Sequence, residues 1–420
     1  MKTKLSIQQD RFFINGSPVY SELKQVNPAY HGLLMNARMI QGVFDDKQDV
    51  KRFDRFGKLF SPEQNTDELI AALPQWYEKG LRAITVGFQG GGPCYTIGNY
   101  TIDNNPYSED GTQIDPAYLS RMDRIIRAAD DLGMIVIVSL LYSSQTRFLK
   151  DDRAVIQAVK TACNWLRDEQ FTNVIIEVAN EQDIPDFKMH PIVFDEREVV
   201  ELMDVAKRES GGLPVGCSRT GGAFDAGIAA ASDVILIHGN GLTSQQFYDL
   251  IQKAKAVRPE RPILCNEDSQ ALSRMSVAFR EGVSWGYFND TTKQEPPVYW
   301  EITKGEDEFF AKRLAISLGI EPEPSTLEEQ FYLQGLEPHM TYEGKRWIRL
   351  ASLYPERIDY VEFYRDGALL CRAYDESYMV NSVGNTWLQE PYTEPVEKGQ
   401  VWKAKVFLYS GDVVEKTVVI

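Results

Sequence analysis

Hydrophobic residues follow a repeating rhythm through the first three quarters of the chain. Short apolar runs alternate eight times with segments whose apolar positions recur at helical spacing. Most of the runs are nearly continuous in Val, Ile and Leu, which is typical of parallel strands covered on both faces. The runs are Gly32–Met35, Ala83–Phe88, Met134–Leu141, Val174–Val178, Leu213–Cys217, Val234–His238, Ile263–Cys265 and Val283–Phe288.

The connecting segments carry helix signals. Asn65–Glu68 is expected to open a helix that stops at Gly80, and Asp115-Pro116 opens another that ends at Leu132-Gly133. Further helices are expected at 153–169, 195–209, 223–231, 244–257 and 306–318. Eight strand–helix units predict an α/β chain that closes into a (β/α)8 TIM barrel. An open doubly wound sheet is the rival, but its GxGxxG phosphate fingerprint after the first strand is absent.

The two ends of the chain follow period two instead. Arg11–Ile14 and Pro18–Tyr20 flank Asn15-Gly16, which predicts a tight hairpin. Beyond about residue 320, alternation as in Trp402–Leu408 predicts a small all-β sandwich of the immunoglobulin-like kind. The expected domains are a hairpin capping the barrel at 1–20, the barrel at 21–320 and the β-sandwich at 335–420.

Composition narrows the function classes. Acidic residues outnumber basic ones by 61 to 45, and a net charge of −16 disfavours nucleic acid and anionic membranes as partners. The five cysteines form no CxxC pair, so neither a zinc ribbon nor a disulfide framework is indicated. The N-terminus lacks the apolar core of a signal peptide and no apolar run reaches 18 residues, which predicts no membrane span. Compartment and oligomeric state stay open.

Two glutamates stand out by their positions. Glu181 follows the fourth apolar run and Glu267 follows the seventh, and each is preceded by an asparagine. The carboxyl ends of barrel strands carry the active sites of such enzymes, and strands four and seven face one another across the mouth. Cleavage of an acetal needs a proton donor and a group that stabilises an oxocarbenium-like centre, and two carboxylates supply both. A helix cap or a solvated strand end would also explain either glutamate alone.

The segments Val174–Glu181 and Ile263–Glu267 resemble glycoside hydrolase clan A, the family-5-like barrels. The residues Phe12–Val19 resemble the short hairpin that often precedes such barrels. The resemblance covers residues 10 to about 318 and implies that Glu181 is the general acid/base and Glu267 the nucleophile of a retaining hydrolase. It implies a carbohydrate substrate and no cofactor or metal.

Other residues near the predicted mouth are candidates for substrate binding. Asn180 precedes the proposed acid, and Asn240 follows His238 at the end of the sixth run. Two interpretations stay open for His238, contact with the nucleophile or an ordinary strand-end histidine, and two for Trp285, sugar stacking or barrel core. The complete set of expected substrate-binding residues is Asn180, Arg38, Gln41, Gln89, Tyr142, His238, Asn240 and Trp285.

Two other functions remain to be weighed. A metal-dependent hydrolase would need histidine ligands, but the chain has only four histidines and no HxH or HExxH motif. A non-catalytic glycan-binding protein on a barrel scaffold is the main alternative, because a fold alone never establishes chemistry. The sugar, the linkage and the role of the C-terminal domain stay open.

Overall fold

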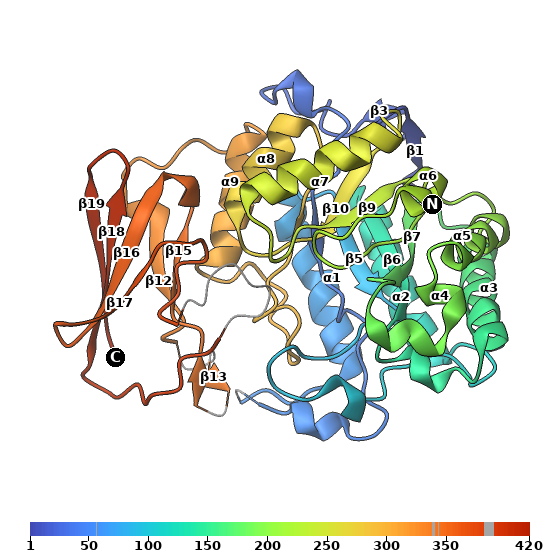
Figure 1. The fold of residues 1–420 in the computed structure, drawn as a ribbon, viewed down its shortest axis with the longest axis horizontal. Helices are drawn as coiled ribbons and strands as arrows, with labels where there is room; N and C mark the ends of the chain where they lie inside the picture. Colours follow the sequence, from blue (N-terminus) through green and yellow to red (C-terminus); the bar gives the residue numbers. More distant parts are fainter. Residues whose placement is uncertain (56, 338–340, 343, 382–389) are drawn as a thin grey trace.

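The computed structural model describes residues 1–55, 57–337, 341–342, 344–381 and 390–420. Two bodies are visible in Figure 1, a barrel that carries the N-terminus and an antiparallel sandwich that carries the C-terminus. In the described part of the chain, no helix is both long and apolar enough to cross a membrane.

Eight short parallel strands form the barrel. Six are joined in the order β11-β4-β5-β6-β7-β8, and β9 pairs with β10. Backbone hydrogen bonds close the ring at both junctions, among them Asp233 N to Val215 O and Cys265 N to Ser284 O, each 2.9 Å long. The strands are β4 (Asn36–Arg38), β5 (Ala83–Gly87), β6 (Ile135–Tyr142), β7 (Val174–Asn180), β8 (Val215–Gly216), β9 (Ile235–His238), β10 (Ile263–Glu267) and β11 (Gly286–Tyr287).

Helices surround the strands, as the α/β prediction requires. The helix at 116–132 ends at Gly133, which takes the left-handed φ of 83° expected of a C-terminal glycine. The helices are α1 (Pro62–Glu78), α2 (Pro116–Leu132), α3 (Asp152–Asp168), α4 (Pro191–Phe194), α5 (Glu198–Glu209), α6 (Ala226–Ala231), α7 (Ser244–Val257), α8 (Leu272–Glu281) and α9 (Glu306–Ser317). The fold is therefore the predicted (β/α)8 barrel.

Some expected boundaries were wrong. The first barrel strand is Asn36–Arg38 and not the apolar run Gly32–Met35, because it is the backbone of Asn36–Arg38 that pairs in register with β5 and β11. Helix α1 begins at Pro62 and not at Asn65, since Ser61 caps it by accepting from the Gln64 N–H. Helix α8 was not expected at all.

The N-terminal segment has three strands where the sequence indicated two. Strand β1 (Leu5–Gln8) pairs with β2 (Arg11–Ile14), which pairs with β3 (Ser17–Pro18). Asn15 and Gly16 form the expected turn, with φ values of 52° and 82°. Thr3 N and Lys2 N both donate to the carboxylate of Asp130 at the end of α2, which fastens the segment to the barrel.

The C-terminal sandwich encloses a core of its own around Phe363, Trp402 and Val406. Its larger sheet has the order β17-β16-β18-β19 and the smaller one pairs β12 with β15, all antiparallel. In Figure 1 the sandwich packs beside α9 and α8. The strands are β12 (Phe331–Gln334), β13 (Thr341–Tyr342), β14 (Lys345–Arg346), β15 (Arg349–Ser352), β16 (Ile358–Arg365), β17 (Ala368–Ala373), β18 (Val401–Leu408) and β19 (Val413–Val419).

Candidate active site

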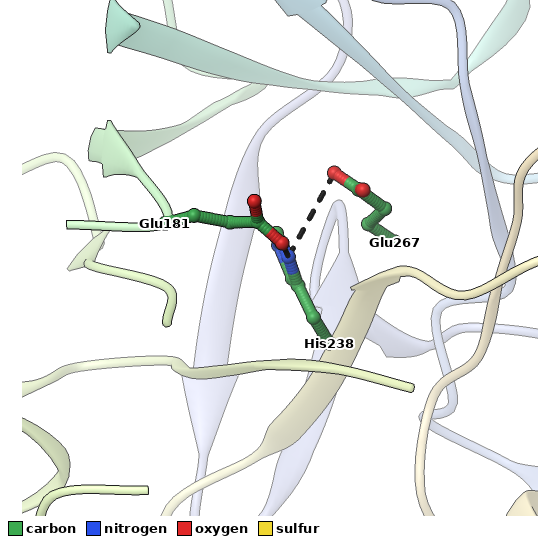
Figure 2. Close-up of side chains that lie close together, drawn as sticks. All are labelled: Glu181, His238 and Glu267. Carbon is green, nitrogen blue, oxygen red and sulfur yellow. Dashed lines mark hydrogen bonds and ion pairs between the residues drawn. The ribbon is translucent and has the colours of Figure 1, made fainter. Parts of the chain in front are cut away.

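Glu181 and Glu267 meet at the carboxyl end of the barrel, with His238 between them. Figure 2 shows both carboxylates directed toward the same imidazole ring. The His238 Nδ1 atom lies 2.9 Å from Glu181 Oε1 and 3.7 Å from Glu267 Oε2. An oxygen of Glu181 and an oxygen of Glu267 lie within 4.8 Å of one another. The two residues singled out by their strand positions are neighbours in space.

Glu181 has an unusual backbone conformation. It directly follows β7 with a φ of 52°, in the left-handed region that residues other than glycine and asparagine rarely adopt. Its N–H donates to Ser218 Oγ at 3.0 Å, which holds this conformation in place. Backbone strain of this kind clusters at functional sites, where it fixes the direction of a side chain.

Glu267 is nearly buried and surrounded by donors. Arg38 Nε lies 3.0 Å from its Oε2 atom as an ion pair, and Asn240 donates to its Oε1 atom at 2.9 Å. Burial raises the pKa of Glu267 above its ordinary value, and Arg38 and His238 act in the opposite direction. The nearby carboxylates of Glu181 and Glu177 also raise the pKa of Glu267.

A third glutamate lies below this pair and was missed as a site residue. Glu177 is fully buried in β7, and its Oε1 atom accepts from Asn266 Nδ2 at 2.8 Å and lies 3.8 Å from His238 Nε2. Burial alone would raise its pKa, but contact with His238 lowers the pKa to about 2. The sequence held a signal, because Glu177 interrupts an apolar strand four residues before Glu181 and so shares its face.

A cavity of about 320 Å³ opens above the two carboxylates. This volume lies at the small end of the usual range for ligand sites. Its lining is mixed, with amide and carboxyl groups beside aromatic and aliphatic side chains. The described lining residues are Arg38, Cys94, Tyr142, Asn180, Glu181, Ile184, Thr220, Gly221, Asn240, Glu267, Phe288 and Gln294.

Four of the expected substrate-binding residues line this cavity: Arg38, Tyr142, Asn180 and Asn240. The Arg38 Nη1 and Asn180 Oδ1 atoms are buried and have no hydrogen-bond partner among the described residues. Each atom therefore keeps unused hydrogen-bonding capacity. His238 lies at the site but beneath the carboxylates, so it contacts the glutamates and not the cavity.

Three expected residues lie elsewhere, and the sequence interpretation is corrected there. The ring of Trp285 is buried, packs against Phe310 and donates its Nε1–H to Asp268 Oδ2 at 2.6 Å, so Trp285 belongs to the barrel core. Gln41 donates to the Gln294 carbonyl. Gln89 donates to Asn105 Oδ1 at 2.7 Å and accepts from the Tyr142 N–H at 2.9 Å. Gln41 and Gln89 support the walls of the cavity without lining it.

The cavity also has lining residues that the sequence did not indicate. Phe288 directly follows β11, and the Arg38 guanidinium lies 5.5 Å from the centre of its ring. Cys94 and Gln294 come from the long loops after β5 and β11, where no periodic pattern marks a functional position. Gly91 makes room for this wall, because a Cβ there would lie 2.5 Å from the Tyr142 ring.

The charges of the cluster bear on metal binding. The ligand atoms of Glu181, His238 and Glu267 lie within 4.8 Å of one another, a spacing at which a metal ion could be shared. Arg38 already places a guanidinium beside Glu267. Burial would lower the pKa of His238, but Glu267, Glu177 and Glu181 together raise it to about 10, so both ring nitrogens carry protons. The arrangement fits a carboxylate pair better than a metal centre.

Comparisons with known proteins agree with the fold. No protein-family model matches the chain. The whole chain aligns with 76% of a putative glycoside hydrolase from Bacteroides vulgatus, with a TM-score of 0.51 and 11% identity. The endo-β-1,4-mannanase of Thermotoga petrophila aligns with 92% of this chain over 97% of its own, with a TM-score of 0.48 and 11% identity. At such identities the first likeness shows a shared fold, and the second carries no further weight.

One curated protein shares a stretch of sequence. It is a component of the ATP-dependent helicase/deoxyribonuclease of Oenococcus oeni and is 23% identical over 214 residues. The match covers 47% of this chain and 18% of that protein, so the chain spans less than a fifth of the relative's length. An identity this low over so small a share shows no family relationship.

Proposed function

We propose that the chain, which has the (β/α)8-barrel fold of glycoside hydrolases, cleaves the glycosidic bonds of an oligo- or polysaccharide with retention of configuration. One observation carries the proposal: an oxygen of Glu181 and an oxygen of Glu267 lie within 4.8 Å of one another beside an open cavity. Retaining enzymes need their carboxyl groups about 5–5.5 Å apart, whereas inverting enzymes separate them by about 6.5–9.5 Å to admit a water molecule.

The surroundings of each glutamate favour different roles. Glu267 receives a guanidinium and an amide donor, which stabilise the anion that attacks the anomeric carbon. Glu181 is the more exposed of the two, with its side chain 15% accessible against 7% for Glu267, so it can reach the leaving oxygen and later a water molecule. Glu181 is thus the proposed general acid/base and Glu267 the proposed nucleophile.

The cavity suits a sugar ring. The Phe288 and Tyr142 rings supply faces for the C–H side of a pyranose, and Asn180 and Asn240 supply amide groups for its hydroxyls. Arg38 Nη1, Asn180 Oδ1, Asn240 Oδ1 and Gln294 Oε1 belong to cavity-lining residues and have unused hydrogen-bonding capacity that a sugar hydroxyl can fill.

The test is hydrolysis of a panel of aryl glycosides and polysaccharides, with the first-formed anomer identified by proton NMR. We expect retention, and a loss of about 10²–10⁴-fold in kcat for Glu181→Gln. Azide added to Glu267→Ala should give a glycosyl azide of inverted configuration, and azide added to Glu181→Ala one of retained configuration. Inverted hydrolysis products, or full activity in both glutamate variants, would exclude the mechanism. Sugar binding without turnover by the wild-type protein would favour a glycan-binding function instead.

A further inference from the structure

Glu177 is placed to act on the site without touching a substrate. It lies in the middle of β7, paired in register with Ser139 of β6 and Gly216 of β8. Both neighbours are small, which leaves room inside the barrel for a glutamate side chain. The residue is fully buried and is not part of the described cavity lining. Burying a carboxylate costs free energy unless the carboxylate is paired. The residue that pairs with Glu177 therefore indicates what Glu177 does.

The partner is His238, whose ring lies among three carboxylates. Its Nδ1 atom faces Glu181 at 2.9 Å and Glu267 at 3.7 Å, and its Nε2 atom faces Glu177 at 3.8 Å. The last distance is that of an ion pair and is too long for a direct hydrogen bond. The charges of Glu181 and Glu267 change during the proposed reaction. Glu177 lies below the cavity, and its negative charge does not change.

We propose that Glu177 is a positioning residue: it is the permanent counter-ion of His238 and keeps that ring an imidazolium beneath Glu181 and Glu267. Only the effect of Glu177 on the reaction rests on the proposed hydrolase function. The ionisation state of the ring itself can be measured without turnover.

The charge balance of the cluster supports this assignment. The groups that face the His238 ring are Glu177 from β7, Glu181 directly after β7 and Glu267 from β10, and Arg38 from β4 pairs with Glu267. Two cations, Arg38 and the imidazolium, balance two anions, Glu177 and Glu267. Glu181 is then the member of the cluster that can hold a proton at no net charge, as a general acid must. Without Glu177, the same balance would leave His238 neutral.

The proton inventory of the reaction follows. In the first step Glu181 gives its proton to the leaving oxygen while Glu267 forms a bond to the anomeric carbon. In the second step water attacks that carbon, the bond to Glu267 breaks and Glu181 regains a proton from the water. Through both steps the His238 Nδ1–H donates to Glu181 Oε1, and His238 neither gains nor loses a proton. Glu177 would thus fix one direction for this hydrogen bond.

The first experiment measures the His238 ring directly. The free protein is labelled with 15N-histidine, and the signal of His238, one of four histidines, is assigned with a His238→Asn variant. We expect both ring nitrogens to be protonated from pH 5 to pH 8.5 in the wild type and in the matched control Glu306→Gln, which removes a buried carboxylate elsewhere. In Glu177→Gln the ring should titrate inside this range, with its pKa at least one unit lower. A wild-type ring that is neutral at pH 8 would overturn the proposal, whatever the protein hydrolyses.

The second experiment uses the pH profile of kcat/KM on the best substrate of the panel. A neutral His238 in Glu177→Gln deprives Glu181 of a charged donor and Glu267 of a nearby cation. The pKa of each glutamate rises, and both limbs of the profile should move to higher pH. Glu177→Asp keeps the charge and should restore the limbs toward their original positions. A lower kcat with unmoved limbs would show that Glu177 acts only in packing.

Discussion

A buried ionic network at the barrel mouth can be compared with another that lies between the barrel and the sandwich. At the mouth, buried polar atoms of Arg38, Glu177, Asn180 and His238 have no hydrogen-bond partner among the described residues. At the interface, Glu306 accepts from Gln334, and its Oε2 atom lies 2.8 Å from the Arg349 guanidinium. A buried polar atom without a partner costs free energy.

The difference distinguishes a ligand-binding site from a structural contact between the barrel and the sandwich, which we call the joint. Asp307, next to Glu306, accepts from Tyr287 at 2.9 Å and from Thr303 at 2.7 Å and pairs with Lys293 at 2.8 Å. Each interface carboxylate thus has hydrogen-bond donors and a cation among the described residues. The mouth keeps unused donors and acceptors next to a cavity, which is useful only if a ligand arrives. Both networks contain glutamates with raised pKa values, so a perturbed pKa alone would not have told them apart.

The largest predicted contrast is between the same substitution in the two networks. Glu267→Gln should lower kcat by about 10²-fold or more, because it removes the proposed nucleophile while keeping the shape of the side chain. Glu306→Gln should leave kcat within a few-fold of the wild type. Steady-state kinetics and thermal melting of both variants give the comparison. Comparable losses of kcat in the two variants would contradict the division into site and joint.

The next contrast concerns stability. Arg349→Met removes the cation beside Glu306 and should lower the free energy of unfolding by about 3–5 kcal/mol, as expected when one partner of a buried pair is lost. KM on a small aryl glycoside should change little. The matched control is Arg372→Met, which breaks the half-exposed pair with Glu362 and should have little effect on stability. A loss of turnover without a loss of stability in Arg349→Met would place the interface within the site.

A third prediction is the pH dependence of stability. Burial raises the pKa of Glu306 to about 7, from an ordinary value of 4.5. Between these values the folded state holds a proton that the unfolded state has released, so this contribution is complete below pH 4.5 and is lost as the pH rises through 7. The loss is on the order of 3 kcal/mol, measurable as a lower urea midpoint at pH 8 than at pH 5. Glu306→Gln should reduce this difference, and an unchanged difference in that variant would refute the assignment.

Activity should depend on pH for a different reason. Burial raises the pKa of Glu267, and a nucleophile must be ionised to react. Activity should therefore fall as the pH drops through that raised value, with the acid limb of kcat/KM above 4.5. In Glu306→Gln this limb should stay in place although the stability profile changes. A limb that moved with the stability profile would mean that unfolding, and not the site, limits activity at low pH.

The sequence predicted the barrel because its evidence is periodic. The barrel prediction rests on eight apolar runs and on the strand-end positions of Glu181 and Glu267. It does not change if any boundary is wrong by a few residues. The cavity walls carry no such periodicity. Cys94 and Gln294 lie in long irregular loops, and their place in the cavity depends on contacts between loops far apart in the chain. Glu177 had a local signal, but its meaning depended on where the sixth strand would place His238.

The same limit explains why the sequence left two interpretations open for Trp285. A tryptophan on the predicted eighth strand suits both sugar stacking and core packing, and only the direction of its side chain decides between them. In the structure Phe288 lines the cavity, and the Trp285 ring lies inside the barrel with its N–H on Asp268. Asp268 also forms an ion pair with Arg274. The buried group of Trp285, Asp268 and Arg274 therefore resembles the joint more than the site.

The smallest predicted effect tests that assignment. Trp285→Phe leaves Asp268 Oδ2 without its tryptophan donor, which should cost about 1–3 kcal/mol of stability and leave KM unchanged. Phe288→Ala should do the reverse, raising KM with little change in stability, because it removes a ring from the cavity wall. Kinetics and urea unfolding of the two variants give both quantities. If Trp285→Phe raised KM as much as Phe288→Ala, Trp285 would belong to the site after all, and the mouth network would extend deeper into the barrel than its unpaired atoms indicate.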